Sequence, residues 1–228
     1  MLTHVIDALA SLDPPPGLAF KGGTALRLCF YEDFRYSADL DFSLVELSAE
    51  AATELLARAC AKPAAQIEFP KLQLTDNTPL RLVYVGPLGR EREIKVDFAD
   101  DELVLEPART HVIKRYTDQT DDRPELWTYT LREVAAEKLR CVIQRLQCRD
   151  VADLHRLLVQ EGVDADDAWE MFETKARAKG IEPSKFAERL ESREPQYRTR
   201  WERELDDLDP NFEEAETVFR ELRRALRS

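Results

Sequence analysis

The sequence has 228 residues, of which 43% are hydrophobic and 34% are charged, as in globular proteins with a substantial core. No stretch approaches the roughly 20 apolar residues of a membrane helix, and the N-terminal MLTHVIDALASLD lacks the basic start of a signal peptide. A net charge of −12 argues against general nucleic-acid binding, so any RNA contact must use a local patch.

The first predicted elements surround a pair of glycines. An amphipathic helix ends before Pro14-Pro15-Pro16, residues 18–20 form a short strand, and a helix over residues 25–31 follows the Gly-Gly turn. Two glycines at a helix start allow backbone N–H groups to approach an anion closely. Gly22, Gly23 and Thr24 are therefore candidate nucleotide-binding residues.

The segment after this helix contains a D-x-D motif in a strand predicted over residues 39–45. Period-two alternation places Asp39, Asp41 and Ser43 on one face and the apolar residues between them on the buried face. Two carboxylates beside a phosphate site suit a magnesium–nucleotide complex, because Mg²⁺ takes few protein ligands plus phosphate oxygens. The alternative is an ordinary amphipathic strand. Arg35 and Ser37, just ahead of the motif, either reach a phosphate or solvate a loop.

Further strands follow a helix over residues 51–61 that Ser48 caps. We expect strands over residues 66–74, 80–84 and 92–98, and a turn over residues 86–89. In the last strand Lys95 and Asp97 share the face opposite the apolar residues. Asp97 is a third candidate metal ligand, although an exposed acid on an amphipathic strand explains it as well.

The chain becomes helical after an irregular region at residues 106–123, which holds one short strand near residues 111–113. The predicted helices cover residues 131–147, 150–161, 165–179, 184–192, 196–206 and 211–226. We therefore expect an α/β core over residues 1–125 and a helical lobe over residues 126–228.

Lys138 lies on the apolar side of the first of these helices, within about 40° of Val134 and Val142. A lysine there loses hydration unless an anion compensates its charge. A triphosphate would do so, and so would an internal salt bridge. Asp150 and Asp153 open the next helix, where capping would be a sufficient explanation for either.

Basic residues gather in one window, residues 127–160, which is the candidate RNA-binding patch. The chain's four cysteines lack C-x-x-C spacing, and three lie in apolar helical contexts, which predicts reduced thiols in a cytoplasmic protein. The three histidines are scattered, so no zinc site is expected.

Taken together, these motifs resemble the AbiEii/AbiGii-type toxin nucleotidyltransferases of the DNA polymerase β-like superfamily. The matching elements, in the family's order, are Lys21-Gly-Gly-Thr24-Ala-Leu, Arg35-x-Ser37-x-Asp39-Leu-Asp41-Phe, Lys95-x-Asp97, Glu137-Lys138-Leu and Arg149-Asp150-x-x-Asp153-Leu. They cover about residues 20–158, and the later helices carry no matching motif.

The resemblance implies an α+β fold, with a mixed sheet flanked by helices and an all-helical C-terminal lobe that contributes to the active-site cleft. It also implies Mg²⁺-dependent transfer of a nucleoside monophosphate from an NTP. In characterised relatives the acceptor is the 3′ end of tRNA, and a separate antitoxin is the partner.

By the same resemblance Asp39 and Asp41 hold metal, Asp97 matches a third carboxylate, Lys138 binds the triphosphate, and Asp153 completes the pocket. Exchange of Asp41 or Lys138 is then expected to abolish activity in a folded protein. One alternative keeps this chemistry but uses a small molecule or a protein as the acceptor. The other is a non-catalytic protein that binds nucleotide or a partner protein.

Overall fold

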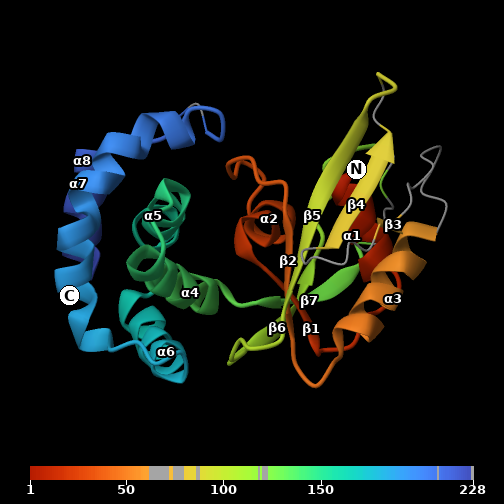
Figure 1. The fold of residues 1–228 in the computed structure, drawn as a ribbon, viewed down its shortest axis with the longest axis horizontal. Coiled ribbons are helices and arrows are strands. Elements are labelled where there is room, and N and C mark those ends of the chain that lie inside the picture. Colours follow the sequence, from red (N-terminus) through yellow and green to blue (C-terminus); the bar gives the residue numbers. More distant parts are fainter. Residues whose placement is uncertain are drawn as a thin grey trace. The chain divides into compact units, whose positions relative to one another are not determined.

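The computed structural model describes residues 1–61, 72–73, 80–85, 88–117, 119, 123–209 and 211–226. It divides into two compact units, Met1–Tyr129 and Thr130–Ser228 (Figure 1). The strand predicted over residues 66–74 lies outside the described residues except for 72–73, which are strand, and of the turn predicted over residues 86–89 only 88–89 are described, as turn and bend. Among the residues described, no helix has both the length and the apolar character needed to cross a membrane.

The first unit is a mixed sheet with helices, as predicted. Its elements are α1 (Leu2–Ala10), β1 (Leu18–Lys21), α2 (Gly22–Ala25), the π-helix η1 (Leu26–Phe30), β2 (Leu40–Leu44), α3 (Ala49–Ala61), β3 (Leu72–Gln73), β4 (Leu80–Val85), β5 (Glu91–Ala99), β6 (Pro107–His111) and β7 (Glu125–Tyr129). The strand order is β3-β4-β5-β2-β1-β7-β6. Strands β1 and β2 are antiparallel, whereas β1 pairs with β7 and β2 with β5 in parallel.

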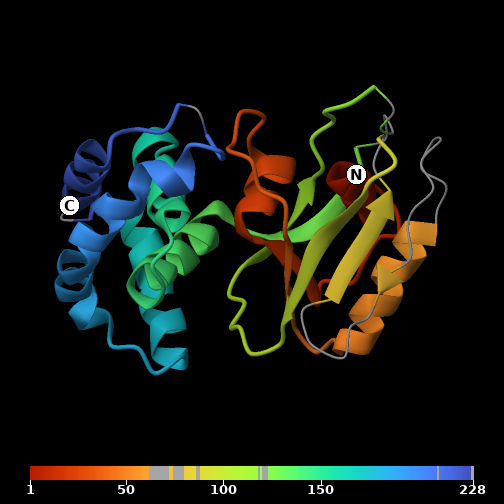
Figure 2. The same ribbon diagram turned by 45° about the horizontal axis from the view of Figure 1, so that its top comes forward.

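Helices α1 and α3 lie together against one face of this sheet (Figure 1). The apolar residues of the D-x-D strand point into the same core: Leu40, Phe42 and Leu44 are at most 4% exposed. Strands β4, drawn in yellow in Figure 2, and β5, drawn in yellow-green, pair antiparallel. The core thus fixes β2 and β5, the two strands that carry the predicted acids.

The D-x-D strand has the predicted alternation, because Asp41 and Ser43 lie on the face of β2 opposite Leu40, Phe42 and Leu44. This second face is also covered at Ser43, which is fully buried, and its Oγ lies 2.7 Å from the Tyr129 hydroxyl. Tyr129 belongs to β7, a strand that the sequence did not indicate. The sequence did not reveal β7 because this segment becomes a strand by pairing with both β1 and β6, which is a tertiary effect.

The neighbouring strand was misplaced. Residues 111–113 were predicted as a strand, but β6 spans Pro107–His111 and ends there. The Ile113 N–H donates instead to the Leu28 carbonyl of η1, at 2.8 Å. The segment after β6 is therefore held against the helix that follows the two glycines.

The second unit is all-helical, as predicted. Its elements are α4 (Leu131–Gln144), α5 (Cys148–His155), the π-helix η2 (Arg156–Gln160), α6 (Ala165–Ala178), the 3₁₀ helix η3 (Pro183–Lys185), α7 (Phe186–Leu205) and α8 (Ala215–Ala225). Helix α7 is continuous where two helices were predicted. Pro195 is exposed, so the carbonyl it leaves unpaired can be hydrated, while Tyr197, Trp201 and Leu205 continue the buried stripe beyond it.

Candidate active site

The turn between β1 and α2 brings the backbone close to a D-x-D carboxylate. Helix α2 begins at Gly22, whose φ of +77° suits glycine. A Cβ at this position would lie 2.8 Å from Asp41 Oδ2. Asp41 is the register partner of Lys21 across β1 and β2. Only glycine leaves the space that separates this helix start from the Asp41 carboxylate.

The next glycine faces a guanidinium. A Cβ on Gly23 would lie 2.7 Å from Arg35 Nη2 and 3.1 Å from Ser37 Oγ. The Thr24 hydroxyl, which is fully buried, donates to Ser37 Oγ at 2.9 Å. Arg35 is itself 8% exposed. The structure therefore brings together the predicted phosphate-site residues of the first unit, namely Gly23, Thr24, Arg35 and Ser37 beside Gly22. Arg35 and Ser37 do more than solvate a loop.

Arg115, which the sequence analysis did not identify, anchors the start of the loop that contains Arg35 and Ser37. The Arg115 guanidinium donates to the carbonyls of Glu32 (2.8 Å), Tyr31 (2.7 Å) and Arg27. These carbonyls lie at the C-terminal end of η1, where a cation is favourable. Burial lowers the pKa of Arg115, with a further contribution from the Arg27 charge. No local pattern could have revealed this contact, because it joins segments far apart in the sequence.

The predicted acids occupy neighbouring strands. Asp41 and Asp97 are register partners on the parallel strands β2 and β5, so their side chains share a face. Asp97 is exposed and lies 3.2 Å from Lys95 Nζ, in agreement with the predicted shared face. Asp39 directly precedes β2 and is partly buried.

Carboxylates beside a glycine-lined turn match the ligands that Mg²⁺ prefers, so the residues present fit a magnesium–nucleotide complex. Within the described part of the chain no three His, Cys, Asp or Glu side chains are gathered tightly enough to hold a metal. The three-acid metal set of Asp39, Asp41 and Asp97 stays a prediction.

In the second unit, Lys138 is the centre of a buried ionic cluster. Lys138 is 5% exposed, and its Nζ lies 2.8 Å from Asp150 Oδ1 and 2.6 Å from Asp153 Oδ2. Arg145 Nε lies 2.8 Å from Asp150 Oδ2. The prediction that Lys138 faces the packed side is confirmed. Its charge is compensated by an internal salt bridge, so burial alone is no longer an argument for a triphosphate.

Capping does not explain Asp150. Helix α5 begins at Cys148, and Asp150 is fully buried within it. Asp150 and Asp153 are three residues apart on one helix and therefore lie on the same face. This spacing in the sequence indicates that the two carboxylates can share one cationic partner. Burial by itself would raise the pKa of Asp150, but the charges of Lys138 and Arg145 outweigh it and hold the pKa well below its usual range.

This cluster predicts a loss of stability in acid. Because folding lowers the pKa of Asp150, its contribution is fully present above the unfolded value of about 4 and is lost as the pH falls toward the folded value. Urea unfolding of the wild type and of Asp150→Asn at pH 7, 5, 4 and 3 measures this. The difference in free energy of unfolding between the two proteins should be largest at pH 7 and shrink below pH 4. A difference that does not change with pH would contradict the assignment.

The basic window at residues 127–160 is not the free cationic patch that was expected. Lys138 and Arg140 are buried. Arg132, Arg145 and Arg156 each lie within about 3 Å of a carboxylate of the same unit, on Asp167, Asp150 and Glu161. The charges of these three arginines are compensated locally, whereas Arg149 Nε donates to the neutral Gln147 side chain at 3.1 Å. The window therefore offers less net attraction for RNA than its sequence suggested.

The cysteines are reduced core residues, as predicted. All four are free and buried. Desolvation raises the pKa of Cys29 and Cys148 to about 12 and of Cys60 and Cys141 to about 11. Thiols with such pKa values are protonated at neutral pH and are poor nucleophiles.

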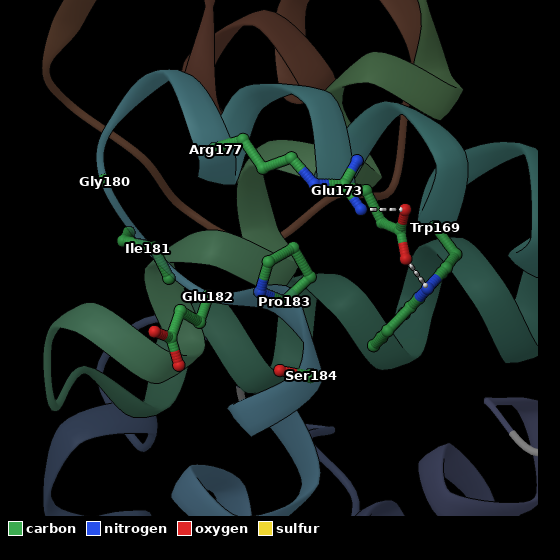
Figure 3. A pocket seen from close by; sticks show the side chains of 8 residues that line it. All are labelled: Trp169, Glu173, Arg177, Gly180, Ile181, Glu182, Pro183 and Ser184. Carbon is green, nitrogen blue, oxygen red and sulfur yellow. Dashed lines mark hydrogen bonds and ion pairs between the residues drawn. The ribbon is translucent and has the colours of Figure 1, made fainter.

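A cavity of about 510 Å³ opens in the second unit (Figure 3). It is lined by Trp169, Glu173, Arg177 and residues 180–184 and contains none of the predicted site residues. Glu173 accepts from Trp169 Nε1 at 3.2 Å and from Arg177 Nη2 at 2.7 Å. These polar groups bind one another, so the cavity has no evident catalytic character.

Comparisons with known proteins agree with the motifs. Among curated proteins there is no match. The chain is similar in structure to MenT4, a nucleotidyltransferase toxin from Mycobacterium tuberculosis H37Rv, with a TM-score of 0.62 and 24% identity over 75% of this chain and 60% of that protein. It is also similar to JHP933 from Helicobacter pylori, with a TM-score of 0.59 and 19% identity over 99% of this chain and 90% of that one.

These likenesses show the fold, and this chain spans only part of the length of MenT4. A family model described as "Nucleotidyl transferase AbiEii toxin, Type IV TA system" matches residues 6–227, nearly the entire chain. The motifs on which the resemblance rested lie within that match. The chain belongs to the AbiEii nucleotidyltransferase toxin family.

Proposed function

We propose that this chain is a toxin that transfers a nucleoside monophosphate from an NTP to an RNA 3′ end, with tRNA the expected acceptor, and so blocks translation in the cytoplasm. A cognate antitoxin is the proposed partner. The observation that carries the proposal is the glycine turn: Asp41 Oδ2 lies beside Gly22, and the Arg35 guanidinium lies beside Gly23. A carboxylate and a cation on either side of the backbone N–H groups at a helix start, which lack intrahelical partners, suit a metal-bound phosphate.

In this proposal the RNA 3′-hydroxyl attacks the α-phosphate, a P–O bond to the RNA forms, and the bond to pyrophosphate breaks. Gly22, Gly23, Thr24, Arg35 and Ser37 hold the phosphates in position. The hydroxyl proton passes to a carboxylate, for which Asp97 is the candidate. We assign Mg²⁺ to Asp39 and Asp41, with Asp97 as a further ligand or a structural acid; when bound, the metal would neutralise charge on the triphosphate.

The roles of Lys138 and Asp153 rest on family membership. Lys138 supplies positive charge for the leaving pyrophosphate, and Asp153, 2.6 Å from its Nζ, orients the ammonium. Because Asp150 and Asp153 already compensate Lys138, this role requires the ammonium to be shared between them and the phosphate.

The direct test is incorporation of each of the four labelled NTPs into total RNA, with release of pyrophosphate measured in parallel. Parallel reactions with small cationic acceptors and with protein are informative, because the net charge of −12 favours a cationic acceptor over RNA. Label in RNA supports the proposal. Label only in a small molecule or in protein would contradict it, as would no release of pyrophosphate.

A methyl group at Gly23 tests the phosphate site without removing any catalytic group. In Gly23→Ala the new Cβ meets the far end of the Arg35 side chain, which can move. We expect a stable fold and about a 10-fold higher KM for NTP, since a charge-assisted phosphate contact is lost. Gly89→Ala is the control for an added methyl group, because its Cβ meets nothing within 4 Å; its φ of +68° disfavours alanine, so this variant should lose some stability but keep its KM. An unchanged KM in Gly23→Ala would argue against Arg35 as a phosphate ligand.

A further inference from the structure

An exposed aromatic ring lies next to the candidate phosphate site. Tyr36 stands between Arg35 and Ser37 in the sequence and is 53% exposed. Its neighbours Arg35 and Ser37 turn toward Gly23 and are not exposed, whereas Tyr36 is open to solvent. In a nucleotide one ribose joins the base to the phosphates, so a ring adjoining a phosphate site is within reach of a base.

The backbone on both sides of this ring is held by arginines. Arg27 Nη1 donates to the Ser37 carbonyl at 3.5 Å, and Arg35 Nη1 donates to the Tyr36 carbonyl at 3.0 Å. The Arg27 guanidinium also lies over the Tyr36 ring, 5.1 Å from its centroid. A cation over one face of a ring is attractive and restricts the ring's orientation. Tyr36 is therefore exposed and yet held in place.

Surface of Tyr36 remains open to a ligand, since the residue is 53% exposed although Arg27 lies over its ring. Among the residues that the structure describes, no aromatic ring stacks on Tyr36, whereas Tyr31 and Phe34 of the same loop stack on each other, with centroids 6.0 Å apart. Arginines interleaved with an exposed aromatic ring are the features that bind single-stranded nucleic acid, since every base has a face that can stack. They occur here, whereas the basic window of the second unit is compensated by its own acids.

We propose that Tyr36, braced by Arg27, is a stacking platform for a nucleobase at the transfer site. The inference rests on the proposed function and extends it to base binding. The base belongs either to the incoming NTP or to the terminal nucleotide of the acceptor RNA. Both bases present the same flat aromatic face, and separate binding measurements with NTP and with tRNA distinguish the two sources.

Equilibrium binding tests the platform without requiring turnover. The dissociation constants of each of the four NTPs with Mg²⁺, by calorimetry, and of deacylated total tRNA, by fluorescence anisotropy, are compared for wild type, Tyr36→Ala and Tyr36→Phe. We expect Tyr36→Ala to raise the dissociation constant of one of the two ligands about 10-fold or more. Tyr36→Phe should bind both ligands as the wild type does. Weaker NTP binding identifies the base as that of the nucleotide, and weaker tRNA binding as that of the acceptor.

Tyr116→Ala is the matched control. Tyr116 is 51% exposed in the same unit, and its ring stacks on His4 with centroids 6.4 Å apart. Unchanged binding of both ligands by Tyr36→Ala would overturn the inference, and so would an equal loss in Tyr36→Phe or in Tyr116→Ala. Failure of the proposed function has a different result, the absence of incorporation by the wild type, so the two failures are distinguishable.

Discussion

Asp41→Asn is expected to lower nucleotide incorporation by at least about 100-fold while the protein stays folded, because a metal at such a site contributes several kcal/mol to transition-state stabilisation. Asp41 is the acid whose surroundings are best defined: it lies beside Gly22 and is the register partner of Asp97. Asparagine keeps the shape but removes the charge that a metal ligand needs. Single-turnover incorporation from a saturating labelled NTP measures the loss.

The control for this exchange is Asp100→Asn. Asp100 directly follows β5 and is exposed, so the variant removes one acid from the same unit outside the predicted metal set. It should retain wild-type activity. Thermal unfolding should leave both variants within a few degrees of the wild type. Full activity in folded Asp41→Asn would reject the site.

Lys138→Met is expected to cost about 3–5 kcal/mol of stability, because it leaves Asp150 and Asp153 buried without their shared cation. The sequence alone predicted an intact fold for exchange of Lys138, and the salt bridges change that expectation. Methionine keeps the length of the side chain, so the loss of stability comes from the missing charge more than from a change in side-chain volume. Urea unfolding at pH 7 gives the free energy of unfolding, and the incorporation assay should show no activity.

A second buried ion pair makes it possible to separate charge loss at the site from instability. Lys175 Nζ lies 2.7 Å from Glu133 Oε1 in the same unit, and both side chains are at most 1% exposed. Lys175→Met should lower stability to a similar extent but keep incorporation wherever the protein remains folded. Equal loss of incorporation in folded samples of both variants would mean that Lys138 acts only through stability.

Several features could be predicted because they depend on local chemistry. Alternation placed the apolar residues of β2 in the core, two adjacent glycines marked the start of α2, and the position of Lys138 on the apolar stripe indicated that it faces the packed side. Ordered motifs indicated the family, whose model matches residues 6–227. The first three of these, and each family motif taken singly, depend on residues only a few positions apart, within reach of periodicity and spacing rules.

Other features were decided by contacts between distant segments. Strand β7 exists through pairing with β1 and β6, and Arg115 holds the end of η1 from a segment more than 80 residues away in the sequence. Helix α7 continues through Pro195 because buried residues on both sides of it pack on one stripe.

Local patterns were enough to indicate the residue types at the predicted positions: two glycines, a D-x-D and a lysine on a packed face. The partners of these residues became visible only in the folded chain. Folding places the Asp41 carboxylate beside Gly22 and the Arg35 guanidinium beside Gly23, and it gives Lys138 two internal carboxylates. This is so because a buried charge needs a counter-charge. Spacing shows that such a group must be compensated, but only the folded chain shows by which residue.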